Sequence, residues 1–128
     1  MARPSAVCPS LAWANAGHPP PLLVRPHGRA RFLAGGEGLP LGVDTDVPRE
    51  AAATAPLTEG SLFLLYTDGL IERRGEDLSV GLERLRGEAG NLRGLSPDHF
   101  LDELVERVAP ARGDDTALLA LWNESASR

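Results

Sequence analysis

The sequence predicts an α+β fold in which a mostly antiparallel sheet carries two helices on one face. Short strand-like runs separated by glycine and proline turns occupy residues 10–66, and from Leu78 onward apolar residues recur at helical spacing. A length of 128 residues with 42% hydrophobic residues suits one small domain. We therefore expect a single globular unit.

The first half of the chain supplies most of the expected strands. The runs 10–16 and 21–25 flank a Gly-His-Pro-Pro break and predict two strands joined by a turn. A short run at 30–33 and a modest one at 50–57 predict further strands. Between them, residues 34–48 are rich in glycine and proline, so we expect a loop with little regular structure.

Two later runs predict the strands at the centre of the fold. SLFLLY at 61–66 is apolar on both faces and lies between Gly60 and Gly69, which predicts a central, fully buried strand. TALLALW at 116–122 predicts a second buried strand near the end of the chain.

Between these two strands the spacing of apolar residues changes from that of a strand to that of a helix. This change predicts helices near residues 79–90 and 97–109. Ser96 suits the N-cap of the second helix, and Pro97 suits its first helical position. Two amphipathic helices need an apolar surface to cover, and the strands provide one. The expected apolar stripes are Leu78, Leu82, Leu85, Ala89 and Leu92 in the first helix and Phe100, Leu101, Leu104, Val105 and Val108 in the second.

Composition narrows the classes of function. Cys8 is the single cysteine, which gives no support to a disulfide, a zinc site or redox chemistry. All 13 basic residues are arginine, without a dense basic cluster interleaved with aromatic residues, and the net charge is -5, so we expect no nucleic-acid partner. The apolar runs are too short to cross a bilayer, and the N-terminus lacks the apolar region of a signal peptide. We expect a cytoplasmic protein without a membrane partner.

Acidic residues stand at the ends of the two central strands. Asp68 closely follows the run 61–66, while Asp114 and Asp115 directly precede the run 116–122. If these strands are antiparallel neighbours, the carboxylates converge at one edge of the sheet. Such a cluster favours a hard divalent cation, Mg²⁺ or Mn²⁺. The alternative is that the Asp-Gly pair is a plain turn and the Asp-Asp pair a solvated loop.

Four segments together resemble one phosphatase family, in the family's order. YTDGLIE at 66–72 resembles the Tyr/Ser-x-Asp-Gly-hydrophobic segment of the protein phosphatase 2C superfamily, in its bacterial sporulation and sigma-regulator branch. WANAGHPPPLLV at 13–24 resembles its NAGHPP signature, LPLGV at 39–43 its Gly-Leu-Pro-Leu-Gly segment, and GDDTALLAL at 113–121 its closing strand. The chain is therefore similar to the C-terminal half of a SpoIIE/RsbU-like PPM (PP2C-type) serine/threonine phosphatase domain.

The resemblance implies a partial αββα sandwich and a metal site. Asp68 and Asp114 match metal ligands of the family, and Asp115 is the neighbouring position. In the family such carboxylates help to hold a two-metal Mn²⁺ or Mg²⁺ site, which activates a water for attack on phosphoserine or phosphothreonine. Gly69 is expected to serve a tight turn.

The strongest family signature consists of Asn15, Gly17 and His18, and the residues alone assign it no chemical role. A lone histidine in a turn is more often a structural hydrogen-bonding residue than a catalyst. These three are candidate site residues to which the sequence assigns no role.

The resemblance also implies that part of the site is absent. The family's N-terminal half supplies further ligands in a segment like DGxGHG, and nothing similar occurs here. We expect residues 10–122 to form the C-terminal half of the domain, residues 1–9 to be disordered or a partial strand, and residues 123–128 to be a frayed tail.

Three interpretations follow for function. The first is a phosphatase domain without its N-terminal half, weakly active or inactive alone, whose substrate is a phosphoprotein such as an anti-sigma-factor antagonist. The second is a catalytically inactive module that binds partners of that kind. The third is a non-functional remnant that folds poorly because its sheet lacks cover.

Overall fold

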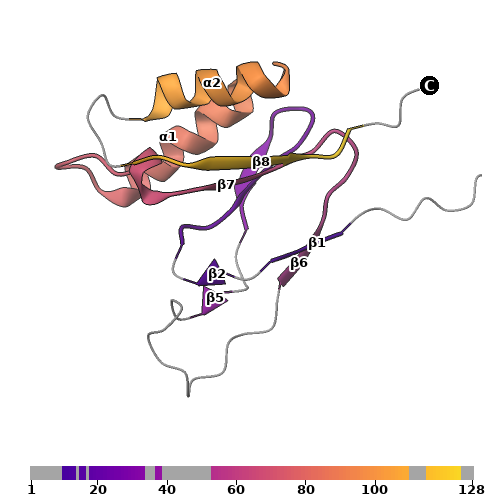
Figure 1. Cartoon of the computed structure of the whole chain (residues 1–128), viewed down its shortest axis with the longest axis horizontal. Helices are drawn as coiled ribbons and strands as arrows, with labels where there is room; N and C mark the ends of the chain where they lie inside the picture. Colours follow the sequence, from indigo (N-terminus) through magenta and orange to yellow (C-terminus); the bar gives the residue numbers. More distant parts are fainter. Residues whose placement is uncertain are drawn as a thin grey trace, which may run out of the picture.

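The predicted α+β architecture is confirmed by the computed structural model. The structure describes residues 10–13, 15–16, 18–33, 37–38, 53–109 and 115–124. Within these residues a four-stranded sheet carries two helices on one face, and a small two-stranded sheet lies on the other face (Figure 1).

The four-stranded sheet is antiparallel throughout, with the strand order β4-β3-β7-β8. The run predicted at 61–66 is a central strand, as expected, because β7 pairs with β3 on one side and with β8 on the other. The strands of this sheet are β3 (Leu22–Val24), β4 (Ala30–Phe32), β7 (Leu62–Tyr66) and β8 (Leu118–Trp122).

The remaining strands form two separate pairs. Antiparallel pairing joins β1 to β6, and a short parallel pairing joins β2 to β5. The strands expected over 10–16 and 21–25 therefore belong to different sheets. Most of the expected loop 34–48 lies outside the described residues. The bounds are β1 (Ser10–Trp13), β2 (Asn15–Ala16), β5 (Glu37–Gly38) and β6 (Ala53–Pro56).

Both predicted helices are present, as α1 (Leu78–Asn91) and α2 (Pro97–Val108). Ser96 occupies the N-cap position of α2, and proline follows it at the first helical position, as expected. The predicted stripe of α1 is wrong at Leu78, because the first turn of this helix is exposed and burial begins at Gly81. No helix in the described part of the chain is both long and apolar enough to cross a membrane.

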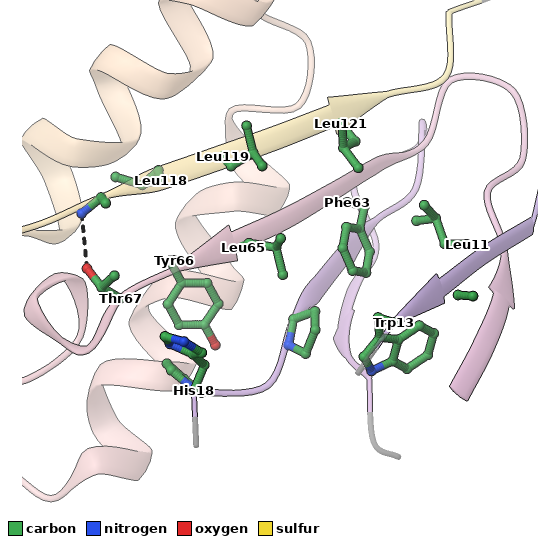
Figure 2. A pocket seen from close by; sticks show the side chains of 14 residues that line it. Leu11, Trp13, His18, Phe63, Leu65, Tyr66, Thr67, Leu118, Leu119 and Leu121 are labelled. Atoms are coloured by element: carbon green, nitrogen blue, oxygen red, sulfur yellow. Dashed lines mark hydrogen bonds between the residues drawn. The ribbon is translucent and has the colours of Figure 1, made fainter. Parts of the chain in front are cut away.

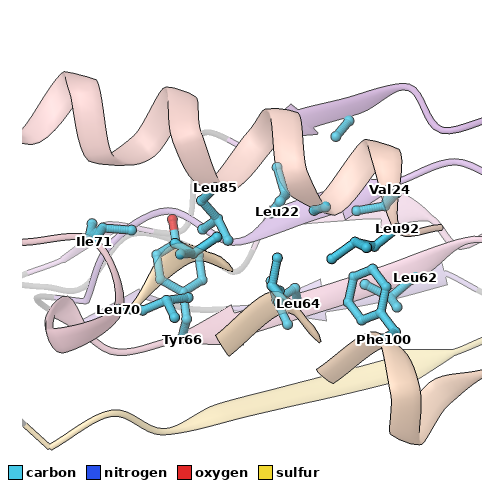
Figure 3. Close-up of a cluster of buried hydrophobic side chains, with 14 residues drawn as sticks. Leu22, Val24, Leu62, Leu64, Tyr66, Leu70, Ile71, Leu85, Leu92 and Phe100 are labelled. Carbon is cyan, nitrogen blue, oxygen red and sulfur yellow. The ribbon is translucent and has the colours of Figure 1, made fainter. Parts of the chain in front are cut away.

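The main core lies between the helices and the sheet (Figure 3). Leu22, Leu62 and Leu64 from the sheet and Leu85 and Phe100 from the helices are completely buried. Each such side chain stabilises the fold by about 1.5–3 kcal/mol through removal of apolar surface from water. The helices and β7 therefore form one packed unit.

The opposite face of the sheet is covered only in part. Leu23 and Phe63 are buried beneath β1 and β6, but Leu65, Leu119 and Leu121 are 37%, 55% and 41% exposed. Side chains alternate between the two faces of a strand, so these three leucines point away from the helices, past the cover that β1 and β6 give. The prediction of full burial was therefore wrong at Leu65 and wrong for β8.

The end of β8 is fixed by Asn123. Its backbone N–H donates to the Ser61 carbonyl at 3.0 Å, and its carbonyl accepts from the Gly60 N–H at 2.6 Å. Its side-chain amide donates to the Leu57 carbonyl at 2.6 Å. The frayed tail expected from residue 123 therefore does not include Asn123. Residues 1–9 and 125–128 lie outside the described residues.

Candidate metal centre

The antiparallel pairing of β7 and β8 brings the end of one strand to the start of the other. Tyr66 is the last residue of β7 in the ladder. Beyond it, the Thr67 N–H donates to the Ala117 carbonyl at 3.1 Å, and the Ala117 N–H donates to the Thr67 hydroxyl at 3.0 Å (Figure 2). Asp68 is one residue past this junction and Asp115 is two residues before it. Both aspartates therefore stand at the same edge of the sheet, the one where β7 ends and β8 begins, as predicted for antiparallel neighbours.

The chain makes a short 3-10 turn at Asp68. The turn spans Asp68–Leu70, and the Ile71 N–H donates to the Asp68 carbonyl at 3.0 Å. Leu70 and Ile71 are buried in the main core, whereas Asp68 is exposed. Gly69 lies in this turn, as expected, but its φ is not in the left-handed region. The buried residues after it therefore anchor the turn and leave the carboxylate at the surface.

Tyr66 connects this edge to the segment that contains His18. Its hydroxyl donates a hydrogen bond to the Pro20 carbonyl at 2.5 Å, and its side chain is 5% exposed. Burial raises the pKa of the Tyr66 phenol far above its usual value, and the nearby charge of Asp68 adds to the rise. Tyr66 was not among the residues predicted for the site. The available signal was a phenol at the end of an apolar strand, since a buried tyrosine hydroxyl needs a partner.

The family signature lies partly within the described structure. His18 is exposed and lines a cavity of about 500 Å³, together with Trp13, Tyr66 and Thr67 (Figure 2). Asn15 pairs through its backbone in the short β2-β5 ladder, and Gly17 lies outside the described residues. The structure thus brings the His18 segment to the end of β7 that carries Asp68.

The donors at this edge suit a hard cation in kind but are few in number. Asp68 and Asp115 are exposed carboxylates, and oxygen donors of this type prefer Mg²⁺ or Mn²⁺. Asp114, the other predicted ligand, lies outside the described residues. Within the part of the chain that the structure describes, no group of three or more His, Cys, Asp or Glu side chains could hold a metal ion. The assignment of these aspartates as ligands therefore stays a prediction.

Comparison with known proteins agrees with the family resemblance of the four sequence segments. The sequence profile of the Stage II sporulation protein E (SpoIIE) family matches residues 3–122. The crystal structure of the RsbU and RsbW domains of Rv1364c from Mycobacterium tuberculosis matches 93% of this chain, with a TM-score of 0.80 and 28% identity. The PP2C phosphatase domain, with a fragment of the regulatory domain, of the cell fate determinant SpoIIE from Bacillus subtilis matches 87%, with a TM-score of 0.56 and 16% identity. This chain spans 34% of the length of each of these structures.

Proposed function

This chain belongs to the stage II sporulation protein E family, and from this premise we propose that it forms part of a metal-dependent protein serine/threonine phosphatase. The observation that carries the proposal is the shared sheet edge of Asp68 and Asp115, fixed by the two hydrogen bonds between Thr67 and Ala117. Carboxylates placed in this way can bind one cation together.

The residues at the edge have two proposed roles. Asp68, with Asp114 and Asp115, binds the cation. With Mn²⁺ or Mg²⁺ held by these carboxylates, the chemistry supplied would be activation of water for attack on a phosphoserine or phosphothreonine ester. Thr67 holds the two strand ends together, so it positions the carboxylates without contact to the substrate. No covalent intermediate on the protein is needed.

The isolated chain has little activity under this proposal. A two-metal site needs more ligands than the three aspartates at these strand ends can supply. The exposed side chains of Leu65, Leu119 and Leu121 support the same conclusion, because an apolar sheet face of this kind suits cover by another layer of protein. We propose that a further segment of the phosphatase domain supplies both the remaining ligands and the cover.

The substrate class follows from the family resemblance. We propose a phosphoprotein, with an anti-sigma-factor antagonist as the specific candidate. The second candidate function is a catalytically inactive module that binds the same kind of protein. Two observations favour it: among the described residues no group of three or more His, Cys, Asp or Glu side chains could hold a metal ion, and an apolar cavity lies beside β8.

The test is hydrolysis of a phosphoserine peptide in the presence of Mn²⁺. We expect little turnover by this chain alone, and turnover after addition of an N-terminal half that carries a DGxGHG segment. Asp68→Asn should abolish the restored activity, whereas Asp102→Asn, which removes the same charge from an exposed position of α2, should not. Robust turnover by the isolated chain would contradict the proposal that its metal site is incomplete. Inactivity after complementation would favour the binding module.

A further inference from the structure

The hairpin between β3 and β4 gathers cationic side chains on one face. Leu23 and Arg31 are paired across the hairpin, so their side chains share the sheet face that points away from the helices. Arg25 and Arg29 close the hairpin, where the Arg25 N–H donates to the Arg29 carbonyl at 2.8 Å. Both lie in the turn, just outside the two strands. The three arginines and His27 line a concavity of about 380 Å³.

The charges of this concavity are not neutralised within the described residues. Arginines on the helices form ion pairs with glutamates, as in Arg84 with Glu76 at 2.5 Å. None of the three hairpin arginines forms an ion pair with a carboxylate in the part of the chain that the structure describes. Three guanidinium groups therefore stand together on a protein with a net charge of -5. Such a local excess attracts anions.

The hairpin is held in a defined shape. Gly28 adopts a φ of +92°, and its N–H donates to the Arg25 carbonyl at 2.9 Å. Gly28 lies against Gly90 of α1 so closely that a Cβ atom on Gly90 would overlap the Gly28 carbonyl oxygen. The Arg25 guanidinium also donates to the Thr58 hydroxyl at 3.2 Å. The backbone of the hairpin and the Arg25 side chain are therefore already ordered before a ligand binds, which lowers the cost of binding.

The concavity is separate from the candidate metal centre. Val24, next to Arg25, pairs with Leu62 at the start of β7, whereas Tyr66 stands at its other end. Four residues of strand place roughly 13 Å between the two sites. An anion bound at the hairpin is thus not the phosphate that would be hydrolysed near Asp68.

The spacing of the arginines favours an extended acidic peptide as the ligand. Arg29 and Arg31 are alternate residues that enter β4, so they are separated by roughly 7 Å along the chain. Alternate side chains of an extended peptide repeat at the same distance, and each guanidinium can bind a carboxylate through paired hydrogen bonds. We propose that this face of the hairpin is a docking site for an acidic segment of a protein partner. Docking at this site does not require that the chain is catalytically active.

The experiment measures binding directly with three probes. The full chain is titrated with a labelled peptide of alternating glutamates, with the same peptide carrying glutamines instead, and with inorganic phosphate as a competitor. We expect binding of the acidic peptide that weakens as salt rises. Arg29→Gln combined with Arg31→Gln should weaken this binding about tenfold or more, since it removes charge-assisted contacts.

The matched control is Arg86→Gln combined with Arg107→Gln, which removes the same charge from the helices and should change binding less than about twofold. Equal binding of the acidic and glutamine peptides would overturn the proposal, as would unchanged binding by the hairpin variant. Phosphate that binds as tightly as the peptide would also overturn it, because a single-anion pocket would then explain the site. Both hairpin positions are exposed, so thermal unfolding should confirm that each variant stays folded.

Discussion

The hydroxyl of Tyr66 donates a hydrogen bond to the backbone carbonyl of Pro20 at 2.5 Å, across 46 residues of sequence. This bond ties the segment of His18 to the end of β7, next to the turn that carries Asp68. Tyr66 also belongs to the main core beneath the helices. One side chain therefore couples the packed core, the family signature and the candidate metal centre.

Removal of this hydrogen bond should destabilise the fold. We expect Tyr66→Phe to lower the free energy of unfolding by about 1 kcal/mol or more, since the Pro20 carbonyl loses its donor while the ring still packs. Urea unfolding of both proteins measures the difference. Unchanged stability would mean that water replaces the hydroxyl at no cost.

Tyr66 should also make the fold less stable at high pH. Burial raises the pKa of Tyr66 in the folded chain, so the folded state keeps the proton where the unfolded chain releases it. Stability should be constant in this respect below pH 10, the usual pKa of tyrosine, and should fall as pH rises above it. Tyr66 is the single tyrosine and the chain has no lysine. Tyrosinate absorbance therefore reports on this group alone, and Tyr66→Phe should remove its share of the pH dependence.

The regular elements of the fold could be predicted from the sequence because their patterns are local. The shift to helical spacing at Leu78 located both helices, and the apolar run at 61–66 located the central strand. Exposure could not be predicted in the same way. Leu65 and Leu119 are as apolar as Leu64, but they point to a sheet face whose cover depends on segments distant in sequence.

The candidate site was predictable only at the level of strand ends. We predicted that Asp68, Asp114 and Asp115 stand at one edge, because pairing direction fixes which strand ends meet. The structure places Asp68 and Asp115 there, and Asp114 lies outside the described residues. The hydrogen bond from Tyr66 to Pro20 was not foreseen, since it depends on the path of the chain after His18. Long-range contacts of this kind leave no periodic signal in the sequence.

Gly81 should be a sensitive position for the orientation of α1. A Cβ atom there would overlap the Ile71 carbonyl oxygen, which follows the turn at Asp68. We expect Gly81→Ala to destabilise the fold by about 1–3 kcal/mol, because the helix must move away from the turn. Denaturant unfolding measures this change.

The matched control is Gly87→Ala in the same helix, where an added Cβ atom meets nothing within 4 Å. This change should stabilise the protein by up to about 1 kcal/mol, since alanine favours the helix more than glycine does. If both variants were stabilised equally, the close contact between α1 and the Ile71 carbonyl would be contradicted.

The exposed leucines of β8 should affect association more than folding. Leu119→Thr is expected to change stability by less than about 0.5 kcal/mol and to reduce self-association, because the side chain is 55% exposed on an apolar sheet face. Leu64→Ala, at a position with no exposure, should cost about 2–5 kcal/mol. Unfolding curves and light scattering distinguish these effects. A large loss of stability in Leu119→Thr would show that this face is already covered.

Mn²⁺ should stabilise the chain weakly through the sheet edge of Asp68 and Asp115. A cation that binds the folded state alone raises the free energy of unfolding by about 1.4 kcal/mol at a free concentration ten times its Kd. We expect a rise in the melting temperature that saturates with Mn²⁺ and that Asp68→Asn removes. Asp102→Asn, which lowers the negative charge equally on an exposed face of α2, should leave the rise intact. If both variants lost the effect to the same extent, the rise would reflect general charge screening. If neither lost it, the cation would bind at a place other than this strand end, and the assignment of Asp68 as a ligand would fail.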